Sequence, residues 1–323
     1  MELSDKVILI TGGTGSFGQK FVEIALQGHS PRAIRIFSRG EFLQWQMQQK
    51  FQDDRLRFLI GDVRDKDRLY RAMSGVDIVV HAAALKQIPT CEYNPIEAVQ
   101  TNIIGSANVV DAAIDQKVDK VILISSDKAV RPLNLYGTTK LAAEKLFVQG
   151  NAYSGGKGTK FSCVRYGNVM GSRGSVLPLF QEQKNKFGKL TITDEKMTRF
   201  WLTLEQGVRL IIDCLCRMQG GEIFVPKIPS IKVVDLATAI DSNVQFEIVG
   251  IRPGEKLSEV LITEEEARHT KEFDNYFVIE PESPFWRYSS EGGKPLPEGF
   301  EYSSNTNKWW LSEDELRRML SGN

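Results

Sequence analysis

The sequence has few of the residues on which disulfide-rich and metal-binding proteins depend. Its 323 residues include four cysteines and three histidines. So few cysteines argue against a disulfide framework and favour a reducing compartment, so we expect a cytoplasmic location. Cys214 and Cys216 lie two residues apart, but they fall in an apolar helical pattern with no histidine close in sequence. We therefore predict no metal site.

Long apolar runs and a net charge are also missing. No apolar run approaches the roughly 20 residues that span a bilayer, and the N-terminal segment lacks the basic and apolar regions of a signal peptide. Basic and acidic residues number 41 each, which gives no general attraction to nucleic acid or to an anionic membrane. We therefore expect neither nucleic acid nor a membrane as a partner.

Short apolar segments alternate with segments of helical periodicity through the first half of the chain. The predicted strands are residues 7–11, 33–37, 56–60, 77–82, 120–125 and 160–164. Repeated strand–helix units predict an α/β fold with a Rossmann-like, doubly wound parallel sheet. The pattern becomes less regular after about Tyr166. We therefore predict a Rossmann domain over residues 1–166 and a smaller, mixed α/β substrate domain over 167–323, with some segments interleaved with the first.

A glycine-rich segment lies where the first strand meets the first helix. Glycines permit a tight turn and the close approach of a diphosphate, whose charge is met by the N-terminal amides of the helix. A glycine-rich turn alone is weak evidence, but its position at the first strand–helix junction predicts dinucleotide binding. The residues assigned to this segment are Gly12, Thr14, Gly15, Ser16, Phe17 and Gly18.

The residues after the second strand bear on the choice of dinucleotide. An acidic residue there would favour NAD, because a carboxylate accepts a hydrogen bond from the ribose 2′-hydroxyl. The sequence has Ser38 and Arg39 instead, and a hydroxyl with a guanidinium suits a 2′-phosphate by charge and geometry. We therefore predict NADP as the cofactor, while Glu41 leaves a ribose contact open.

Further cofactor contacts are expected where the third and fourth strands end. Asp62 is a candidate for the adenine amino group, and small residues after the fourth strand would let the cofactor lie against the main chain. Lys86 is a candidate for a phosphate or for the substrate, whereas we expect His81 to be a hydrogen-bonded structural residue. The residues assigned to these strand ends are Asp62, Val63, Ala82, Ala83 and Lys86.

The pattern Tyr-x-x-x-Lys occurs twice, from Tyr136 to Lys140 and from Tyr153 to Lys157. A tyrosine phenolate beside a lysine ammonium can take the proton of a hydroxyl group while a nicotinamide takes the hydride. Only the first copy follows closely on Ser125–Lys128, at the carboxyl end of a predicted parallel strand, where ligands bind in such sheets. We therefore choose the first copy, and the Asp-Lys pair before it offers an acid and a base for a second step.

These motifs, in this order, resemble the extended short-chain dehydrogenase/reductase superfamily. Within it, the chain resembles the inverting UDP-N-acetylglucosamine 4,6-dehydratases of pseudaminic acid biosynthesis, from about Lys6 to Asn305. Ser126 departs from that family, in which we expect threonine, but both residues supply a hydroxyl group. The segments that carry the resemblance are Ser125–Lys128, Asn134–Gly137, Arg165–Val169, Gly171–Ser175, Met197–Phe200 and Arg252–Lys256.

The resemblance implies an NADP-dependent lyase that oxidises C4 of UDP-N-acetylglucosamine, eliminates water across C5 and C6, and inverts C5. It makes Tyr136 the base for the C4 hydroxyl, while Lys140 lowers the pKa of Tyr136 and holds the nicotinamide ribose. Lys128 then takes the C5 proton and Asp127 protonates the departing C6 hydroxyl, with Ser126 in the same catalytic group. The product would be a 4-keto-6-deoxy sugar on the way to pseudaminic acid or a related bacterial surface sugar.

The resemblance also assigns residues to the nucleotide sugar. Arginines suit its diphosphate, because they donate forked, charge-assisted hydrogen bonds, and Glu255 is assigned to the ribose. Helices beside the active site commonly pair subunits in this superfamily, so we expect a homo-oligomer. The substrate-binding residues implied are Lys86, Asn168, Arg173, Gly174, Ser175, Thr191, Arg199, Arg252 and Glu255, and Val169 is implied at the cofactor.

Three other functions stay open. The C5-retaining 4,6-dehydratases usually carry glutamate at the position of Lys128, and the sugar 4-epimerases lack the acid–base pair altogether. Asp127 and Lys128 are therefore the residues that separate these enzymes from the inverting dehydratases. A non-catalytic NADP-binding sensor would be favoured by loss of Tyr136 or Lys140, and both residues are present.

Overall fold

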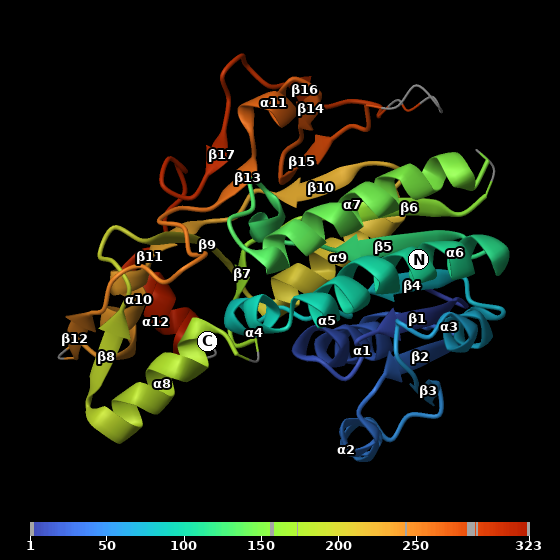
Figure 1. The fold of residues 1–323 in the computed structure, drawn as a ribbon, viewed down its shortest axis with the longest axis horizontal. Helices are drawn as coiled ribbons and strands as arrows, with labels where there is room; N and C mark the ends of the chain where they lie inside the picture. Colours follow the sequence, from blue (N-terminus) through green and yellow to red (C-terminus); the bar gives the residue numbers. More distant parts are fainter. Residues whose placement is uncertain are drawn as a thin grey trace.

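A ten-stranded sheet runs through the computed structural model, which describes residues 3–155, 158–172, 174–242, 244–282, 288 and 290–321. Seven strands are parallel, in the order β3-β2-β1-β4-β5-β6-β10, and β15, β14 and β16 continue the sheet in alternating directions (Figure 1). The strands are β1 (Val7–Thr11), β2 (Ala33–Ser38), β3 (Leu56–Ile60), β4 (Ile78–His81), β5 (Lys120–Ile124), β6 (Lys160–Val164), β10 (Ile223–Pro226), β14 (Thr270–Glu272), β15 (Tyr276–Ile279) and β16 (Lys294–Pro295).

Helices cover both faces of this sheet. On one face α6 contacts both α3 and α7, and α1 packs against α9 on the other; Figure 1 shows α6 and α7 in front of the strands. The elements between the parallel strands are α1 (Ser16–Gly28), α2 (Glu41–Phe51), α3 (Lys66–Met73), α4 (Ile88–Tyr93), α5 (Pro95–Val99), the π-helix η1 (Gln100–Ile104), α6 (Gly105–Asp115), the 3₁₀-helix η2 (Asp127–Ala129), α7 (Leu135–Tyr153) and α9 (Leu204–Arg217).

The apolar runs of the sequence explain why the sheet forms. All five residues of β1 are buried, as expected for a parallel strand covered by helices on both faces. The six predicted strands are all present, each within one residue of its predicted ends. The strand order β3-β2-β1-β4-β5-β6 reverses direction between β1 and β4. The predicted Rossmann-like, doubly wound α/β fold is thus confirmed.

A smaller part of the molecule lies beyond the carboxyl ends of the parallel strands. It has its own apolar core, which includes Leu190, Trp201, Ile231 and Leu236. Segments after residue 166 contribute to this part and also supply β10, β14, β15 and β16 to the large sheet. Its elements are β7 (Asn168–Val169), α8 (Val176–Phe187), β8 (Lys189–Ile192), β9 (Thr198–Leu202), β11 (Ser230–Lys232), α10 (Val233–Ile240), β12 (Gln245–Ile248) and α12 (Glu313–Ser321). Three further elements, β13 (Val260–Ile262), α11 (Glu264–Ala267) and β17 (Tyr302–Ser303), add buried residues to the core of the large sheet.

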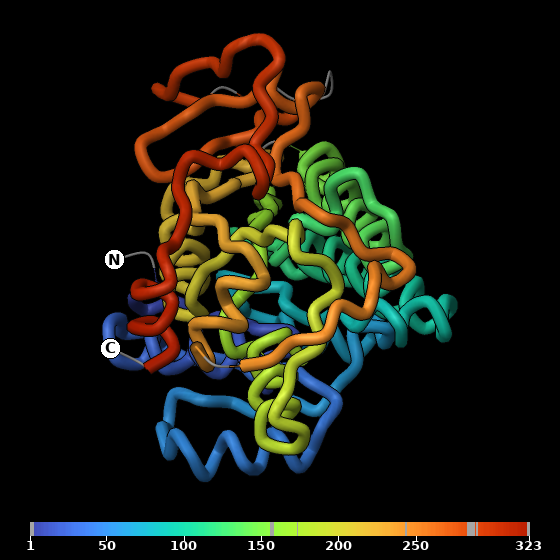
Figure 2. Tube along the Cα trace, turned by 90° about the vertical axis from the view of Figure 1, so that its left-hand side faces the viewer, coloured from blue at the N-terminus to red at the C-terminus, as the bar shows by residue number. Residues whose placement is uncertain are grey.

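The C-terminal segment crosses from one part to the other. Figure 2 shows it running from the antiparallel strands at the top of the molecule down to the last helix. On the way β17 pairs with β13, and α12 packs on α10. Within the described ranges, no helix combines the length and the apolar character needed to cross a bilayer.

Candidate active site

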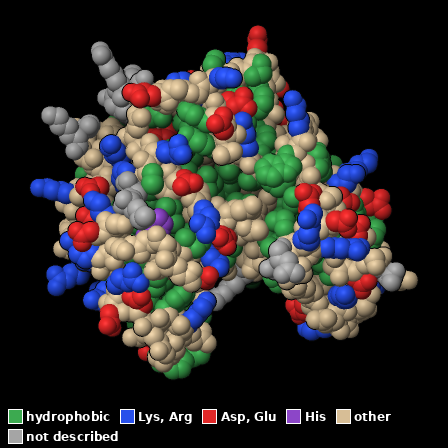
Figure 3. All heavy atoms as spheres, turned by 180° about the vertical axis from the view of Figure 1, so that it is seen from behind, with side chains coloured by type: hydrophobic (Ala, Val, Ile, Leu, Met, Phe, Trp, Pro, Cys, Tyr) green, Lys and Arg blue, Asp and Glu red, His purple; other side chains and the backbone are tan. Residues whose placement is uncertain are grey.

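A cleft of about 670 Å³ lies at the carboxyl ends of the parallel strands, between the large sheet and the smaller part. Seen from behind, the molecule is hollowed between two lobes (Figure 3). The cleft includes the point at which the strand order reverses, between β1 and β4. Doubly wound sheets bind their ligands at that point.

The glycine turn between β1 and α1 forms one wall of the cleft. Gly12 has a positive φ of 66°, and a Cβ there would lie 2.9 Å from the Cα of Ala83. Gly15 precedes α1 and no side chain caps that helix, so its first amides face the cleft rather than a capping group. These features fit the diphosphate of a dinucleotide. Gly18 serves packing, because a Cβ there would meet the Gly13 carbonyl oxygen at 2.2 Å.

Most residues assigned from the sequence line this one cleft. They are Gly12, Thr14, Gly15, Ser16, Phe17, Ser38, Arg39, Asp62, Val63, Ala82, Ala83, Lys86, Ser126, Lys128, Tyr136, Lys140, Asn168, Val169, Gly174, Ser175, Arg252 and Glu255. The lining does not include Gly18, Glu41, Asp127, Thr191 or Arg199, and Arg173 lies outside the described residues. Segments that are far apart in the sequence therefore meet around one cavity.

The assigned residues away from the cleft wall have other partners in this structure. Glu41 is exposed at the start of α2. The Thr191 hydroxyl accepts a hydrogen bond from Gln183 Nε2 at 2.8 Å. Arg199 is only 9% exposed, and its Nη1 donates to the main-chain oxygens of Thr198 (2.7 Å) and Leu257 (3.2 Å). A contact between Arg199 and a diphosphate would therefore require its side chain to change partners.

His81 is fixed within the large sheet. Its Nδ1 lies 2.6 Å from the Thr11 hydroxyl and its Nε2 lies 3.2 Å from the Ser106 hydroxyl. Burial, together with the charge of Lys140, lowers the pKa of His81 to about 3. The ring is therefore neutral and fully hydrogen-bonded, and the prediction of a structural histidine is confirmed.

A cationic side chain follows the end of β2. Arg39 is 57% exposed at the cleft, and its Nη1 lies 3.9 Å from Asp62 Oδ2. Asp62 is more closely engaged by Arg64, whose Nη2 donates to Oδ2 at 2.7 Å. Partial burial raises the pKa of Asp62, but the hydrogen bonds from Arg64 outweigh it and lower the pKa overall. The Ser38 hydroxyl accepts a hydrogen bond from Gln44, so Arg39 is the charged group exposed at this strand end.

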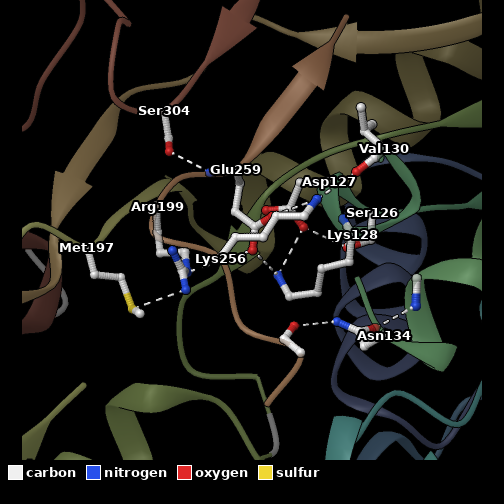
Figure 4. A network of polar contacts seen from close by, with 12 residues as sticks. Ser126, Asp127, Lys128, Val130, Asn134, Met197, Arg199, Lys256, Glu259 and Ser304 are labelled. Atoms are coloured by element: carbon white, nitrogen blue, oxygen red, sulfur yellow. Dashed lines mark hydrogen bonds and ion pairs between the residues drawn. The ribbon is translucent and has the colours of Figure 1, made fainter. Parts of the chain in front are cut away.

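Asp127 and Lys128 form the single turn η2 directly after β5 (Figure 4). The Ser126 hydroxyl and the Lys128 ammonium both donate to Asp127 Oδ1, at 2.8 and 3.0 Å. Asp127 is fully buried, and its Oδ2 has no hydrogen-bond partner within the described residues. Burial lowers the pKa of Lys128, but Asp127 and Glu259 raise it above its ordinary value. Lys128 is therefore an ammonium ion in this state.

Helix α7 packs directly against this turn. Asn134 caps the helix, because its Oδ1 accepts a hydrogen bond from the Gly137 amide at 2.8 Å. A Cβ on Gly137 would lie 2.1 Å from the main-chain oxygen of Lys128. Only glycine permits this approach, which brings Tyr136 into the cleft wall that Lys128 and Ser126 also line.

The charges around Tyr136 differ from the expectation. Burial raises the pKa of its hydroxyl to about 12, while the charge of Lys128 and a hydrogen bond with Ser126 lower it. Lys128, rather than the predicted Lys140, is thus the cation that favours the phenolate here. The Lys140 ammonium donates to the main-chain oxygen of Ile124 at 2.6 Å, one helical turn further along α7. Burial lowers the pKa of Lys140 to about 8, although Glu144 raises it.

The structure separates the two Tyr-x-x-x-Lys patterns. Tyr136 and Lys140 lie one helical turn apart on α7 and both line the cleft. Tyr153 is the last residue of the same helix, is 70% exposed and is not part of the cleft. Lys157 lies outside the described residues. The geometry therefore supports the first pattern as the functional candidate.

A second group of buried charges lies further along α7. Arg165 is 1% exposed and stands between Glu144 on α7 and Glu266 on α11. Its guanidinium donates to both oxygens of Glu144, at 3.1 and 2.7 Å, and to both oxygens of Glu266, at 2.9 Å each. It also donates to the Leu261 carbonyl at 2.9 Å. This group ties the helix that carries Tyr136 to α11 and β13.

The segment after β12 brings Arg252 and Glu255 to the cleft. Two hydrogen bonds hold the segment against α7 and the end of η2 (Figure 4). The Asn134 side-chain amide donates to the Gly254 carbonyl at 2.8 Å, and Lys256 donates to a main-chain carbonyl just after η2 at 2.6 Å. The residue that caps α7 therefore also anchors the segment that carries Arg252.

Sequence reasoning missed Lys256 and Glu259 as members of the polar group around Lys128. Glu259 is 3% exposed, and its Oε1 lies 3.5 Å from the Lys128 ammonium. A signal was present, because a glutamate directly precedes the apolar run Val260–Ile262 and follows the Arg252–Lys256 motif by three residues. Within the described ranges, no group of three or more histidine, cysteine, aspartate or glutamate side chains is arranged to hold a metal ion.

Comparison with known proteins gives a consistent assignment. The family model described as polysaccharide biosynthesis protein matches residues 8–281. Two proteins of Campylobacter jejuni subsp. jejuni, from serotypes O:23/36 and O:2, are 50% and 48% identical to the chain over 325 residues, which cover 98% of this chain and 97% of each relative. Both are named UDP-N-acetylglucosamine 4,6-dehydratase (inverting).

More distant relatives carry another name. A Rickettsia massiliae protein named UDP-glucose 4-epimerase is 41% identical, over 98% of this chain and 95% of its own length. Among solved structures, the X-ray structure of Pen from Bacillus thuringiensis is 41% identical with a TM-score of 0.91, and the match covers 100% of both chains. The resemblance drawn from the sequence motifs is confirmed at the level of the family: the chain belongs to the polysaccharide biosynthesis protein family.

Proposed function

We propose that the protein is an NADP-dependent UDP-N-acetylglucosamine 4,6-dehydratase that inverts C5. Its product would be UDP-2-acetamido-2,6-dideoxy-β-L-arabino-hex-4-ulose, the first intermediate toward pseudaminic acid or a related bacterial surface sugar. The names of the two Campylobacter jejuni relatives support this substrate and this stereochemistry.

One observation carries the proposal. The oxidising pair, Tyr136 and Lys140, shares a cleft with Ser126 and Lys128, and the buried Asp127 carboxylate lies directly behind Lys128. Oxidation alone needs only the tyrosine and the lysine, whereas elimination of water needs an additional acid and base. The second pair is therefore the feature that favours a dehydratase.

The first step is oxidation at C4. NADP, held at the glycine turn, would accept the C4 hydride and return it at C6, so the overall reaction has no net redox change. Tyr136 takes the proton of the C4 hydroxyl, and the charge of Lys128 supports the phenolate. Lys140 lies close enough to the end of β5 to orient the nicotinamide ribose.

The ion pair of Asp127 and Lys128 becomes the acid and the base that elimination needs when one proton moves from Lys128 to Asp127. Nζ and Oδ1 are 3.0 Å apart, so the proton can move from the ammonium to the carboxylate along the hydrogen bond. Lys128 then takes the C5 proton while Asp127 gives its proton to the C6 hydroxyl, which leaves as water. Lys128 ends protonated and Asp127 ends ionised, so the pair returns to its starting state. When the hydride returns to C6, C5 would take a proton on the face opposite to the one that lost it, which inverts C5. Tyr136 holds the proton of the C4 hydroxyl, and its release balances this uptake.

The preference for NADP over NAD is also part of the proposal. It is supported by Arg39, which is exposed beside the cleft directly after β2, whereas Glu41 is not part of the cleft lining. A cytoplasmic location and a homo-oligomeric state complete the proposal. Light scattering coupled to size-exclusion chromatography tests the oligomeric state.

Proton NMR of UDP-N-acetylglucosamine incubated with the NADP-loaded protein in deuterated water tests the proposed reaction. We expect a C6 methyl signal, a 4-keto product or its hydrate, and deuterium at C5 in the L-arabino configuration. A methyl signal with the D-xylo configuration would indicate a C5-retaining dehydratase instead. Absence of the methyl signal while the substrate is converted would exclude both dehydratase reactions.

A UDP-hexosamine 4-epimerase is the second candidate. It is supported by the Rickettsia massiliae relative, which is named UDP-glucose 4-epimerase and covers 98% of this chain. An epimerase would use Tyr136 and Lys140 alone and would convert the substrate to UDP-N-acetylgalactosamine. The same NMR experiment distinguishes the two reactions, because epimerisation shifts the C4 proton and leaves the C6 methylene group intact.

A further inference from the structure

Glu259 is a buried carboxylate at the centre of the polar group behind the cleft (Figure 4). Its side chain is surrounded by three cations. Oε1 lies 3.5 Å from the Lys128 ammonium and 3.9 Å from Arg199 Nε, and Oε2 lies 3.8 Å from the Lys256 ammonium. Its main chain is fixed by Ser304, which accepts a hydrogen bond from the Glu259 amide and donates one to the Glu259 carbonyl.

The Glu259 carboxylate is buried among cations that stand too far away for short hydrogen bonds. Oε2 has no hydrogen-bond partner within the described residues, and the three cations stand at 3.5–3.9 Å. Burying a carboxylate without hydrogen bonds is costly, and an ion pair in the interior often fails to repay that cost. The contribution of Glu259 to stability therefore does not account for its position.

Of the three cations, Lys128 depends most on Glu259. Arg199 and Lys256 also donate to main-chain carbonyl oxygens, at 2.7 and 3.2 Å for Arg199 and 2.6 Å for Lys256. Within the described residues, the Lys128 ammonium contacts two carboxylates, those of Asp127 and Glu259. Glu259 is thus the second of two carboxylates that hold this ammonium.

The two carboxylates would play different parts during elimination. In the proposed reaction Asp127 begins the step protonated, so it carries no charge when Lys128 starts to take the C5 proton. As the C5–H bond breaks, its electron pair forms the C5–C6 double bond and a new N–H bond makes Lys128 an ammonium. A fixed negative charge beside that nitrogen lowers the energy of the transition state. Glu259 is the remaining carboxylate in contact with Lys128, and it exchanges no proton.

We propose that Glu259 is a positioning residue for proton abstraction: it holds Lys128 at the cleft wall and supplies the negative charge that faces the ammonium as it forms. This inference rests on the proposed dehydratase function. Glu259 acts mainly on elimination, because during oxidation at C4 Lys128 is already an ammonium that the ionised Asp127 also holds.

The variant Glu259→Gln tests this role, because it keeps the shape of the side chain and removes its charge. Stopped-flow absorbance at 340 nm separates the two steps when NADP-loaded protein is mixed with UDP-N-acetylglucosamine. The signal rises as C4 is oxidised and decays once elimination allows the hydride to return. We expect the rise within about twofold of the unmodified protein and a decay at least tenfold slower, an effect within the range of a lost electrostatic contact. Deuterium at C5 of the substrate should slow that decay further.

Two variants serve as controls. Glu259→Asp keeps the charge and should restore most of the decay rate. Glu222→Gln removes a glutamate that is also buried, 1% exposed, but stands just before β10 at the opposite end of the sheet. It accepts hydrogen bonds from the amides of Gln219 and Gly220, so its loss should lower the melting temperature and leave the decay rate within twofold.

The outcomes separate this inference from the proposed function. If the unmodified protein forms no methyl product, the dehydratase function itself is wrong. If it forms the product and Glu259→Gln decays as fast, or if folded Glu259→Asp is as slow as Glu259→Gln, the role of Glu259 is overturned and the function stands. Should Glu259→Gln fail to fold, Ser304→Ala disturbs the same carboxylate through its main chain. A slower decay there supports the role, and an unchanged decay contradicts it.

Discussion

The protein buries two groups of charged side chains at different points along α7, and they differ in how completely their hydrogen bonds are made. Around Glu144 on α7, Arg165 donates five hydrogen bonds to Glu144, Glu266 and a carbonyl group, all between 2.7 and 3.1 Å. Beside the cleft, Asp127 and Glu259 each keep a buried oxygen that has no hydrogen-bond partner among the residues that the structure describes. The first group is saturated and the second is not.

The difference follows from what each group has to do. A saturated network resists change, because every shift breaks a charge-assisted hydrogen bond. A group that must pass protons needs donors and acceptors whose partners can change during the reaction. The two carboxylates that hold Lys128 therefore mark the place where chemistry is proposed, whereas the Arg165 network holds the helix that presents Tyr136. Four variants test this contrast, in order of decreasing expected effect.

Lys128→Ala should have the largest effect. Removing the proposed base should lower the rate of methyl-product formation about a thousand-fold, which lies within the usual contribution of a general base. NADP affinity, measured by calorimetry, should stay within about twofold. Lys186→Ala, an exposed lysine on α8, is the matched control and should retain full activity. Substantial turnover by Lys128→Ala would remove this residue from the base role.

Arg165→Met should have the largest effect on stability. It leaves Glu144 and Glu266 without their shared cation, and breaking a buried ion pair from one side costs about 3–5 kcal/mol. Urea unfolding measures the loss. Arg209→Met removes an exposed arginine that pairs with Glu205, and this control should change stability by less than about 0.5 kcal/mol. Equal effects of the two variants would show that the buried network contributes no special stability.

Lys140 should make stability depend on pH. Its pKa is lowered from 10.5 to about 8 in the folded state, so between those values the unfolded chain binds a proton that the folded protein has lost. Stability therefore rises with pH through this window. Relative to Lys140→Met, the unmodified apoprotein should gain about 2 kcal/mol in its free energy of unfolding between pH 8 and 10. A parallel pH dependence of the two proteins would contradict the lowered pKa.

Arg39→Ala should have the smallest effect, because an exposed charge belongs to neither buried group. We expect NADP affinity to fall about tenfold and NAD affinity to change little, since only NADP has the 2′-phosphate. Arg32→Ala is the control, because the Arg32 side chain is also 57% exposed but lies at the other end of β2. A preference for NADP that survives Arg39→Ala would mean that another group reads the 2′-phosphate.

Prediction from the sequence was most accurate where a regular pattern of apolar residues corresponds to a regular secondary-structure element. Buried parallel strands are continuous apolar runs, so β1, β3 and β6 were predicted with the ends that they have. The glycine turn was predictable because its position depends on the strand before it. The strands β14, β15 and β16, which extend the sheet from late in the chain, were not predicted. β14 and β16 are short and have few apolar residues, and β15 is an apolar run of four residues that lies outside the strand–helix alternation.

The site was only partly predictable, for a different physical reason. Motifs identify residues that share a short segment, such as Asp127 and Lys128, but not partners brought in by folding. Glu259 lies 131 residues after Lys128 in the sequence but contacts it in the structure. The pairing of β13 with β17 and the hydrogen bonds to Ser304 place Glu259 there. The expected partner of Tyr136 was the lysine one helical turn away, whereas the cation that acts on it in this structure is on the adjoining turn.

The missing side chain at Gly137 has a consequence for how new activities arise on this scaffold. Because a methyl group there would lie 2.1 Å from the Lys128 carbonyl oxygen, the turn and the helix form one unit of fixed spacing. Insertions or bulkier residues at this junction would push the two reactive pairs apart. Enzymes that share this architecture are therefore expected to diversify by exchanging the side chains on the turn, while the distance between the turn and the helix stays the same.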